Sequence, residues 1–262
     1  MPFNFFPQLK ILTYEQIEST NTLAWQRLKD GEAQNGDIIL ANYQINGKGQ
    51  GKNTWYSTDG SNLLLSFICK DIQIKATQLT QLNMLVSLSV FNTVNYFFPE
   101  MASLKWPNDI MVNEQKIAGI LIETALQGEY IKNAVIGIGI NINEENFPEF
   151  LPAACSFNTL SKKYHDLDSV FNILIEQLDK QLSKLKISGF EEIREEYESV
   201  LFGMETIRYF RSGEKEFSGI IKGINGHGQL CVEVDGKIKI FNNKEIEFEM
   251  PIKVNSYKSP KI

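Results

Sequence analysis

The segment 44–55 carries residue types that bind anionic groups. It reads Gln-Ile-Asn-Gly-Lys-Gly-Gln-Gly-Lys-Asn-Thr-Trp, with three alternating glycines and two lysines. Alternating glycines let backbone N–H groups converge on an anion, and a lysine adds positive charge where a phosphate or carboxylate would lie. The spacing matches neither the P-loop nor the dinucleotide-binding fingerprint. The segment therefore predicts an anion-binding loop, and a flexible surface loop is the alternative.

A second segment brings two lysines and a carboxylate to one turn. Residues 104–110 read Leu-Lys-Trp-Pro-Asn-Asp-Ile, and residues 116–123 read Lys-Ile-Ala-Gly-Ile-Leu-Ile-Glu. Lys105 and Lys116 bracket a turn between apolar strands, so both ammonium groups and the Asp109 carboxylate should lie at one end of a sheet. Two ammonium groups repel each other unless an anion lies between them. The alternative is a plain hairpin whose lysines extend into solvent.

A third segment, 135–143, alternates glycine with isoleucine and reads Val-Ile-Gly-Ile-Gly-Ile-Asn-Ile-Asn. Because successive side chains of a strand point to opposite faces, one face of this strand lacks side chains. Such a bare face suits a flat ligand or a second backbone lying against it, and tight packing between strands explains the pattern equally well.

The elements that must position these segments alternate between strands and helices. Apolar residues recur at helical spacing from Leu79 to Phe98, and a second stripe runs from Val170 to Leu185, before a charged helix over 191–201. Strands are predicted over 38–43, 63–69, 110–112, 117–123 and 130–142. The short turn at 113–115 favours an antiparallel hairpin. We therefore expect an α+β fold with a central mixed sheet that carries helices.

The hydrophobic pattern of the sequence changes after Gly203. Short apolar alternations occur around 207, 217–221, 230–234, 238–241 and 246–248, separated by Gly- and Asn-rich turns. We expect a first domain over 1–202, a small β-barrel over 203–250, and a frayed tail over 251–262.

Composition narrows the classes of function. The 262 residues include 26 basic and 32 acidic side chains, and the net charge of -6 argues against nucleic-acid binding as the main function. Three cysteines and two histidines without paired spacing argue against a zinc site and suggest a reducing compartment. No apolar run reaches the roughly 18 residues of a membrane span. A cytoplasmic protein without nucleic-acid or membrane partners is expected.

Taken in order, the motifs resemble the biotin-protein ligases. That family has a glycine-and-arginine loop, a Lys-Trp-Pro-Asn-Asp segment, a Lys-(Leu/Ile)-Ala-Gly-Ile-Leu strand and a Gly-x-Gly-Ile-Asn strand, in this order along the chain. The resemblance runs from Ser19-Thr20-Asn21 to the terminal strands and implies a class II synthetase-like catalytic domain followed by an SH3-like barrel. It also implies that biotin and ATP, with Mg²⁺, form biotinyl-5′-adenylate. The biotinyl group would then pass to one lysine of a biotin carboxyl carrier domain.

The resemblance also implies roles for individual residues. The implied catalytic residues are Lys48, Lys105, Asp109 and Lys116. The implied biotin-binding residues are Ser19, Thr20, Asn21, Gln44, Gly47, Lys48, Lys116 and Gly119. The implied nucleotide-binding residues are Lys48, Gly49, Gln50, Trp55, Asn108, Asn141 and Lys222. We identify no set of protein ligands for the metal ion, and Asp109 is expected either to accept a proton or to orient the carrier lysine.

The loop departs from the family pattern, because Lys48 and Gln50 stand where arginines are common and Lys52 where a glycine is frequent. Because the resemblance begins within the first twenty residues, a monofunctional form without a DNA-binding domain is expected, either a monomer or a homodimer. The alternatives are a lipoate- or octanoate-protein ligase, a biotin-responsive repressor and a non-catalytic SH3-like interaction protein.

Overall fold

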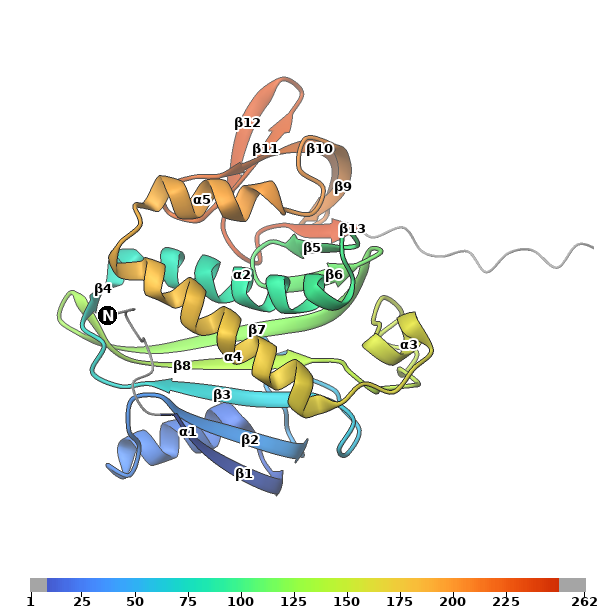
Figure 1. Ribbon diagram of the computed structural model, residues 1–262. Coiled ribbons are helices and arrows are strands. Elements are labelled where there is room, and N and C mark those ends of the chain that lie inside the picture. The colour runs from blue at the N-terminus through green and yellow to red at the C-terminus, as the bar shows by residue number, and fades with distance from the viewer. Residues whose placement is uncertain (1–8, 250–262) are drawn as a thin grey trace, which may run out of the picture. The chain divides into compact units, whose positions relative to one another are not determined.

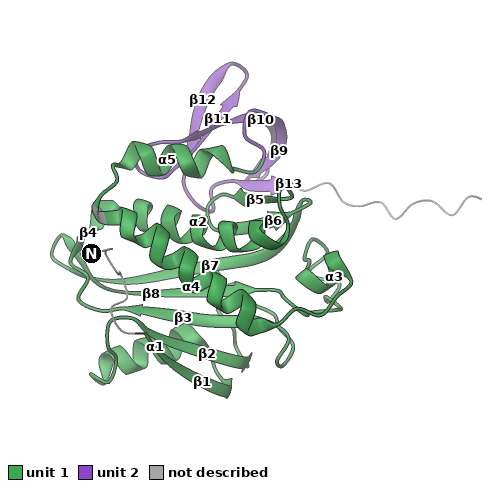
Figure 2. Ribbon diagram, in the orientation of Figure 1, with its two compact units in different colours: residues 1–202 green, residues 203–262 purple. Residues whose placement is uncertain are grey.

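The computed structural model describes residues 9–249, and it divides the chain into two compact units, residues 1–202 and 203–262 (Figure 2). The expected frayed tail over 251–262 lies outside the described residues. Each unit has a sheet of its own, and the residues with expected chemistry lie in the first unit, apart from Lys222.

The first unit is built on an eight-stranded mixed sheet in the order β1-β2-β3-β8-β7-β6-β5, with the short β4 on β8. The strands are β1 (Lys10–Ile17), β2 (Asp37–Gln44), β3 (Leu63–Cys69), β4 (Ile74–Lys75), β5 (Ala102–Lys105), β6 (Asp109–Val112), β7 (Gln115–Gln127) and β8 (Tyr130–Ile140). Only β1 and β2 pair in parallel, and the other described pairs are antiparallel. This confirms the predicted mixed sheet.

Helices cover both faces of this sheet, as Figure 1 shows. They are α1 (Thr20–Lys29), α2 (Leu79–Phe97), α3 (Phe157–Ser161), α4 (Leu167–Ser183) and α5 (Phe190–Ser199). Helix α1 packs on β2, β3 and β8, while α4 and α5 pack on α2. Strand β3 is buried along its whole length because both of its faces are covered. None of the helices in 9–249 has the length and apolar character needed to cross a bilayer.

The hairpin between β6 and β7 forms as predicted, because Asn113 and Glu114 adopt left-handed backbone angles of φ 50° and 64°. Two such residues in succession turn the chain tightly in a way that suits the twist of the strands. Antiparallel pairing sets Met111 opposite Lys116 and Asp109 opposite Gly119, with a bulge between Ile110 and Met111. The hairpin therefore places Lys116 and Asp109 at neighbouring positions on adjacent strands.

The second unit is a five-stranded antiparallel sheet in the order β12-β11-β10-β9-β13. Its strands are β9 (Ile207–Ser212), β10 (Lys215–Ile224), β11 (Leu230–Val234), β12 (Lys237–Phe241) and β13 (Glu247–Glu249). All five match the predicted apolar alternations. Stacked and edge-on rings of Phe210, Phe217, Phe241 and Phe248 pack together inside this unit.

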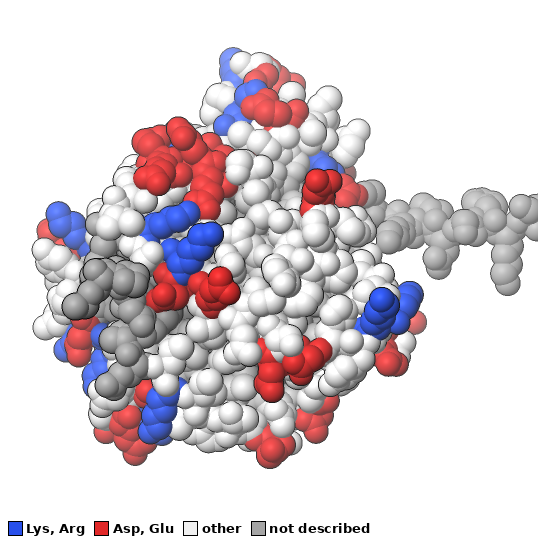
Figure 3. Space-filling model, viewed as in Figure 1, with Lys and Arg blue, Asp and Glu red and all other residues white. Residues whose placement is uncertain are grey.

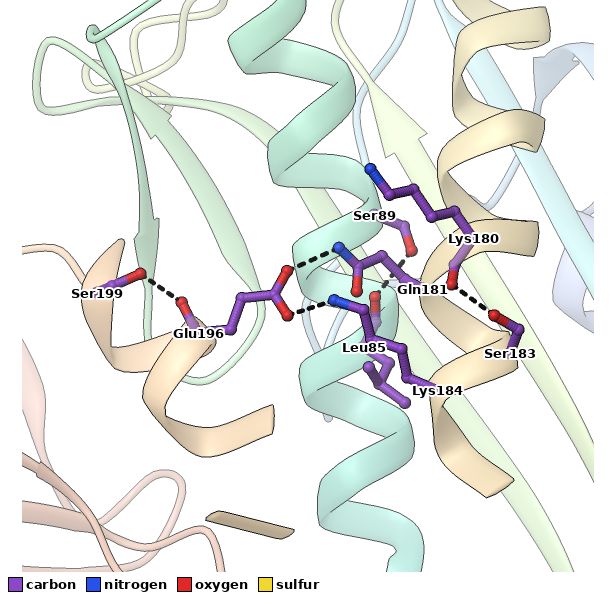
Figure 4. A network of polar contacts seen from close by, with 8 residues as sticks. All are labelled: Leu85, Ser89, Lys180, Gln181, Ser183, Lys184, Glu196 and Ser199. Atoms are coloured by element: carbon purple, nitrogen blue, oxygen red, sulfur yellow. Dashed lines mark hydrogen bonds and ion pairs between the residues drawn. The ribbon is translucent and has the colours of Figure 1, made fainter. Parts of the chain in front are cut away.

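One partly buried carboxylate ties α4 to α5. Glu196 accepts a hydrogen bond of 2.9 Å from Gln181 Nε2 and a second one, with an ion pair, from Lys184 Nζ (Figure 4). Acidic side chains gather over α5 beside basic ones at the end of α4 on the face drawn in Figure 3. Burial alone would raise the pKa of Glu196, but the bonds from Lys184 and Gln181 outweigh burial, so its pKa lies below the ordinary 4.5.

We predict that Glu196→Gln lowers the free energy of unfolding by about 1 kcal/mol at pH 7, since the pair is partly exposed. A lowered pKa means that the ionised carboxylate stabilises the fold above about pH 4.5 and that this gain disappears as pH falls further. Urea denaturation at pH 7 and pH 3 should show the difference between wild type and variant shrinking at the lower pH. The control is Glu195→Gln on the exposed side of α5, and an equal loss in both variants would contradict the prediction.

Candidate active site

Three glycines form a floor without side chains on the face of the sheet that α1 covers. Gly119 on β7 lies opposite Gly139 on β8, and Gly137 lies two residues earlier on β8. A Cβ atom would come within 2.8 Å of the Trp55 ring at Gly119 and within 2.5 Å of it at Gly139. At Gly137 a Cβ would collide with the Asn21 side chain. The glycine–isoleucine alternation thus lets an indole ring and an amide of the same chain lie directly on the backbone.

Beside this floor, four buried side chains form a polar cluster, which we define as Thr20, Asn21, Gln44 and Ser66. The Thr20 backbone N–H donates to Gln44 Oε1 at 2.8 Å, and Thr20 Oγ lies 3.1 Å from the same atom. Ser66 Oγ lies 2.7 Å from Thr20 Oγ and 2.6 Å from Asn21 Oδ1. The start of α1 and strand β2 therefore bring the predicted biotin-binding residues Thr20, Asn21 and Gln44 together, with Ser66 of β3 beside them. Ser19, which precedes Thr20, is also buried.

Neither Glu123 nor Ser66 was predicted as a site residue, and the structure places both at this cluster. Glu123 Oε2 accepts hydrogen bonds from Asn21 Nδ2 at 2.8 Å and Trp25 Nε1 at 3.2 Å. Its Oε1 lies 3.7 Å from Lys48 Nζ. The available signal for Glu123 was an acidic residue directly after the apolar run 117–122, and the signal for Ser66 was a lone serine within an apolar strand.

Lys116 and Asp109 meet at the other side of the glycine floor. Their Nζ and Oδ1 atoms are 2.7 Å apart, and Lys116 Nζ lies 5.5 Å from the centre of the Trp55 ring. The Lys116 backbone is held by the segment after β8, because its N–H donates to Ala153 O and its C=O accepts from Cys155 N–H. Lys105 lies opposite Asp109 in the β5–β6 ladder. Two lysines and one carboxylate therefore share this end of the sheet.

The glycine loop is folded back on itself. Trp55 N–H donates to Gly47 O at 2.8 Å, and Gly49 N–H donates to Asn53 O at 2.8 Å. Lys48 and Thr54 therefore pair as an isolated antiparallel β-bridge of the backbone. The Gly49 amide therefore binds a carbonyl of its own loop here, whereas the sequence suggested glycine amides directed at an anion. The cause is the return of the chain at Gly51, whose φ of 66° suits glycine.

Three residues expected at the nucleotide are engaged in other contacts in this structure. The buried Asn108 donates from Nδ2 to Ile120 O, and Asn141 donates from Nδ2 to Cys155 O at 3.0 Å. Asn141 Oδ1 is buried without a hydrogen-bond partner among the described residues. Lys222 belongs to the second unit, where the hydrogen bond to Glu205 raises its pKa. Within 9–249, no group of three His, Cys, Asp or Glu side chains is arranged to hold a metal ion.

The model of the biotin/lipoate A/B protein ligase family matches residues 13–141 of the chain. This segment, just under half of the chain, belongs to that family. The chain is 28% identical to the bifunctional ligase/repressor BirA of Bacillus subtilis over 90% of this chain and 73% of the relative. It is 25% identical to the biotin--[acetyl-CoA-carboxylase] ligase of Mycobacterium tuberculosis over 88% and 86% of the two chains.

Solved structures agree with this assignment to the biotin/lipoate A/B protein ligases. The biotin protein ligase of Aquifex aeolicus in complex with biotin and ATP superimposes with a TM-score of 0.77 at 25% identity, covering 92% of this chain and 98% of that one. The protein is accordingly a ligase. The matched range 13–141 contains the glycine floor, the polar cluster, Glu123 and the Lys116–Asp109 pair, so the whole described constellation lies within the family region.

We predict that Gly139→Ala lowers the free energy of unfolding by about 1–3 kcal/mol, because the new Cβ must displace the Trp55 ring. In a Trp55→Ala background the same change should cost less than about 0.5 kcal/mol, since the opposing ring is gone. Urea denaturation followed by circular dichroism measures the free energy of unfolding of all four proteins in this double-mutant cycle: wild type, both single variants and the double variant. Gly226→Ala, where a Cβ meets nothing within 4 Å, is the control. Equal costs in the two backgrounds would show that the indole does not press on Gly139.

Proposed function

We propose that the protein is an ATP-dependent biotin-protein ligase that forms biotinyl-5′-adenylate and transfers biotin to a lysine of a biotin carboxyl carrier domain. The observation that carries this proposal is the neutral polar cluster lying on the same sheet face as the Lys116–Asp109 pair. The names of the relatives and the Aquifex aeolicus complex with biotin and ATP support it.

The polar cluster suits the neutral ureido ring of biotin. Its hydroxyl and amide groups offer donors and acceptors without net charge, as recognition of an uncharged polar ring requires. Lipoate and octanoate carry an apolar chain end instead, which would leave the buried groups of Thr20, Gln44 and Ser66 without a matching partner. The cluster therefore favours biotin over lipoate, the other acid in the name of the family, and over octanoate.

For the first half-reaction we propose attack of the biotin carboxylate on the α-phosphorus of ATP, with pyrophosphate leaving. Negative charge accumulates between two anionic groups, so fixed cations lower the barrier. Lys116 would hold the carboxylate oxygen, while Lys48 and Lys105 would face the phosphate. Asp109 fixes the position of the Lys116 ammonium group through their 2.7 Å contact. Mg²⁺ would neutralise the leaving pyrophosphate and take most of its ligands from the phosphates themselves.

For the second half-reaction we propose that an uncharged amine of the carrier lysine attacks the mixed anhydride. The Asp109 carboxylate lies 2.7 Å from the Lys116 ammonium group, so the ion pair holds it at the reacting end of the site. It would therefore orient the incoming amine by accepting a hydrogen bond. AMP would leave with both electrons of the broken C–O bond, and the proton lost by the new amide nitrogen would pass to solvent. This assigns orientation, and not proton abstraction, to Asp109.

We also propose the finer features that the family resemblance implies. The first unit would be a class II synthetase-like catalytic domain, the second an SH3-like barrel, and the enzyme a cytoplasmic monomer or homodimer without a DNA-binding role. Asn108, Asn141, Trp55 and Gln50 would contact the nucleotide, as would Lys222. For Asn141 the buried Oδ1 without a protein partner supports this role.

Mass spectrometry of a biotin carboxyl carrier domain tests the proposed function. After incubation with the protein, ATP and Mg²⁺, one lysine of the carrier should gain biotin, and parallel reactions with lipoate and octanoate should leave the carrier unmodified. Modification with lipoate or octanoate, and none with biotin, would contradict the proposal and assign the protein to lipoate or octanoate attachment instead.

We predict that Lys116→Ala reduces biotin-dependent pyrophosphate release by on the order of a hundredfold or more, because a fixed charge partner of the reacting anion is lost. The fold should remain, since the Lys116 side chain is 38% exposed. Lys10→Ala, on an exposed position of β1, is the control and should release pyrophosphate at the wild-type rate. Ordinary turnover by a folded Lys116→Ala protein would remove this residue from the mechanism.

A further inference from the structure

Glu123 is placed to determine the direction of the hydrogen bonds in the polar cluster. An ionised carboxylate only accepts, so the group of Asn21 that lies 2.8 Å from Glu123 Oε2 must be its NH₂. The other end of the same amide is then an acceptor, and it faces Ser66 Oγ at 2.6 Å. The orientation of the Asn21 amide is therefore fixed by the charge at Glu123.

This orientation decides where two hydroxyl protons go. Ser66 has one proton for its contacts with Asn21 Oδ1 and Thr20 Oγ, at 2.6 and 2.7 Å. Because Asn21 Oδ1 can only accept, the Ser66 proton is directed to Asn21. The short contact between Ser66 and Thr20 then needs the Thr20 proton, since two oxygens without a proton between them repel each other at this distance.

The outcome is a defined pattern of hydrogen-bond donors and acceptors at Thr20 and Gln44. Gln44 Oε1 already accepts the Thr20 backbone N–H at 2.8 Å, which directs the Gln44 amide with its NH₂ away from Thr20. The two hydroxyl protons can serve only two of the three contacts, so donation from Thr20 to Ser66 leaves the longest one, 3.1 Å between Thr20 Oγ and Gln44 Oε1, without a proton. Thr20 Oγ then keeps lone pairs that can accept. An acceptor at Thr20 and a donor at Gln44 Nε2 complement a ring that carries N–H and C=O groups side by side.

We propose that Glu123 is a positioning residue that sets this acceptor–donor pattern and thereby the affinity of the ligase for the ureido ring. The proposal rests on the proposed biotin ligase function. Trp25 Nε1 at 3.2 Å holds the same oxygen of Glu123 from α1, and Lys48 Nζ at 3.7 Å lies near the other oxygen. A competing role for Glu123 is to neutralise Lys48 alone, and the experiment separates the two.

The test exchanges the carboxylate and the amide between positions 21 and 123. In Glu123→Gln, the amide introduced at position 123 can meet either end of Asn21, so the pattern is no longer fixed. We expect the KM for biotin to rise about tenfold in pyrophosphate release, with kcat and the KM for ATP changing less than about threefold. Asn21→Asp alone should also raise the biotin KM, because two carboxylates then face each other.

In Asn21→Asp/Glu123→Gln, the new amide donates to the new carboxylate, whose other oxygen still accepts the Ser66 proton. The biotin KM should return to within about threefold of wild type. A structural defect or loss of the Lys48 contact would not be repaired by this exchange. A double variant no better than the poorer single variant would overturn the proposal, as would an unchanged KM in Glu123→Gln.

The control Glu129→Gln removes the same charge from the exposed β7–β8 turn and should leave both KM values unchanged. Calorimetric titration of each purified protein with biotin alone measures affinity independently of turnover and should show the same order of variants. A wild-type protein that neither binds nor activates biotin would overturn both proposals. An active wild type with equal biotin affinity in all variants would overturn only the role of Glu123.

Discussion

The close packing of the Trp55 indole on Gly119 and Gly139 is the constraint on which the site depends. The ring occupies the space where any larger residue would place a Cβ, so the two glycines and the tryptophan fit together as one unit. Trp55 ends the glycine loop, and its N–H closes that loop onto Gly47. The contact therefore fixes the loop against the sheet and brings it beside Lys116, whose ammonium group lies over the same ring.

Charge in the site is arranged as two separate pairs. Lys116 lies 2.7 Å from Asp109, and Lys48 lies 3.7 Å from Glu123, on the two sides of the floor and the cluster. These side chains are partly exposed, so the pairs themselves contribute little to stability. The two ion pairs instead hold the ammonium groups at defined positions. A carboxylate or phosphate that enters the site must compete with Asp109 or Glu123 for the same ammonium group.

Residues beyond the matched family region hold the reacting end in place. The Leu104 backbone bonds to Val200 and Phe202, and the Tyr197 hydroxyl donates to Pro107 O at 3.3 Å. Burial raises the pKa of Tyr197 well above its ordinary value, and the charge of Asp109 adds to this, so the phenol remains a donor. Helix α5 thus supports the segment 104–109, and the Glu196 contact with α4 fixes α5 in turn.

Local sequence determined the elements whose own pattern is strong. Helices α2 and α4 follow from long apolar stripes, the β6–β7 hairpin from its short turn, and the five strands of the second unit from alternation between Gly- and Asn-rich turns. The order of the three motifs also carried the family resemblance, because glycines and lysines at those spacings are few and recognisable. The half-exposed β1 and the polar α1 were not predicted, since their patterns are weak and packing on β2 and β3 stabilises them.

Only the tertiary structure decided how the chemical groups meet. Asn21 and Glu123 are 102 residues apart, and Asn21 and Ser66 are 45 apart, so no local pattern relates them. The sequence likewise left open whether the bare strand face served a ligand, a backbone or close packing, and the structure lays the indole of Trp55 on it. The physical reason is that a residue's spacing fixes which face it occupies, whereas the partner on that face depends on how distant segments pack.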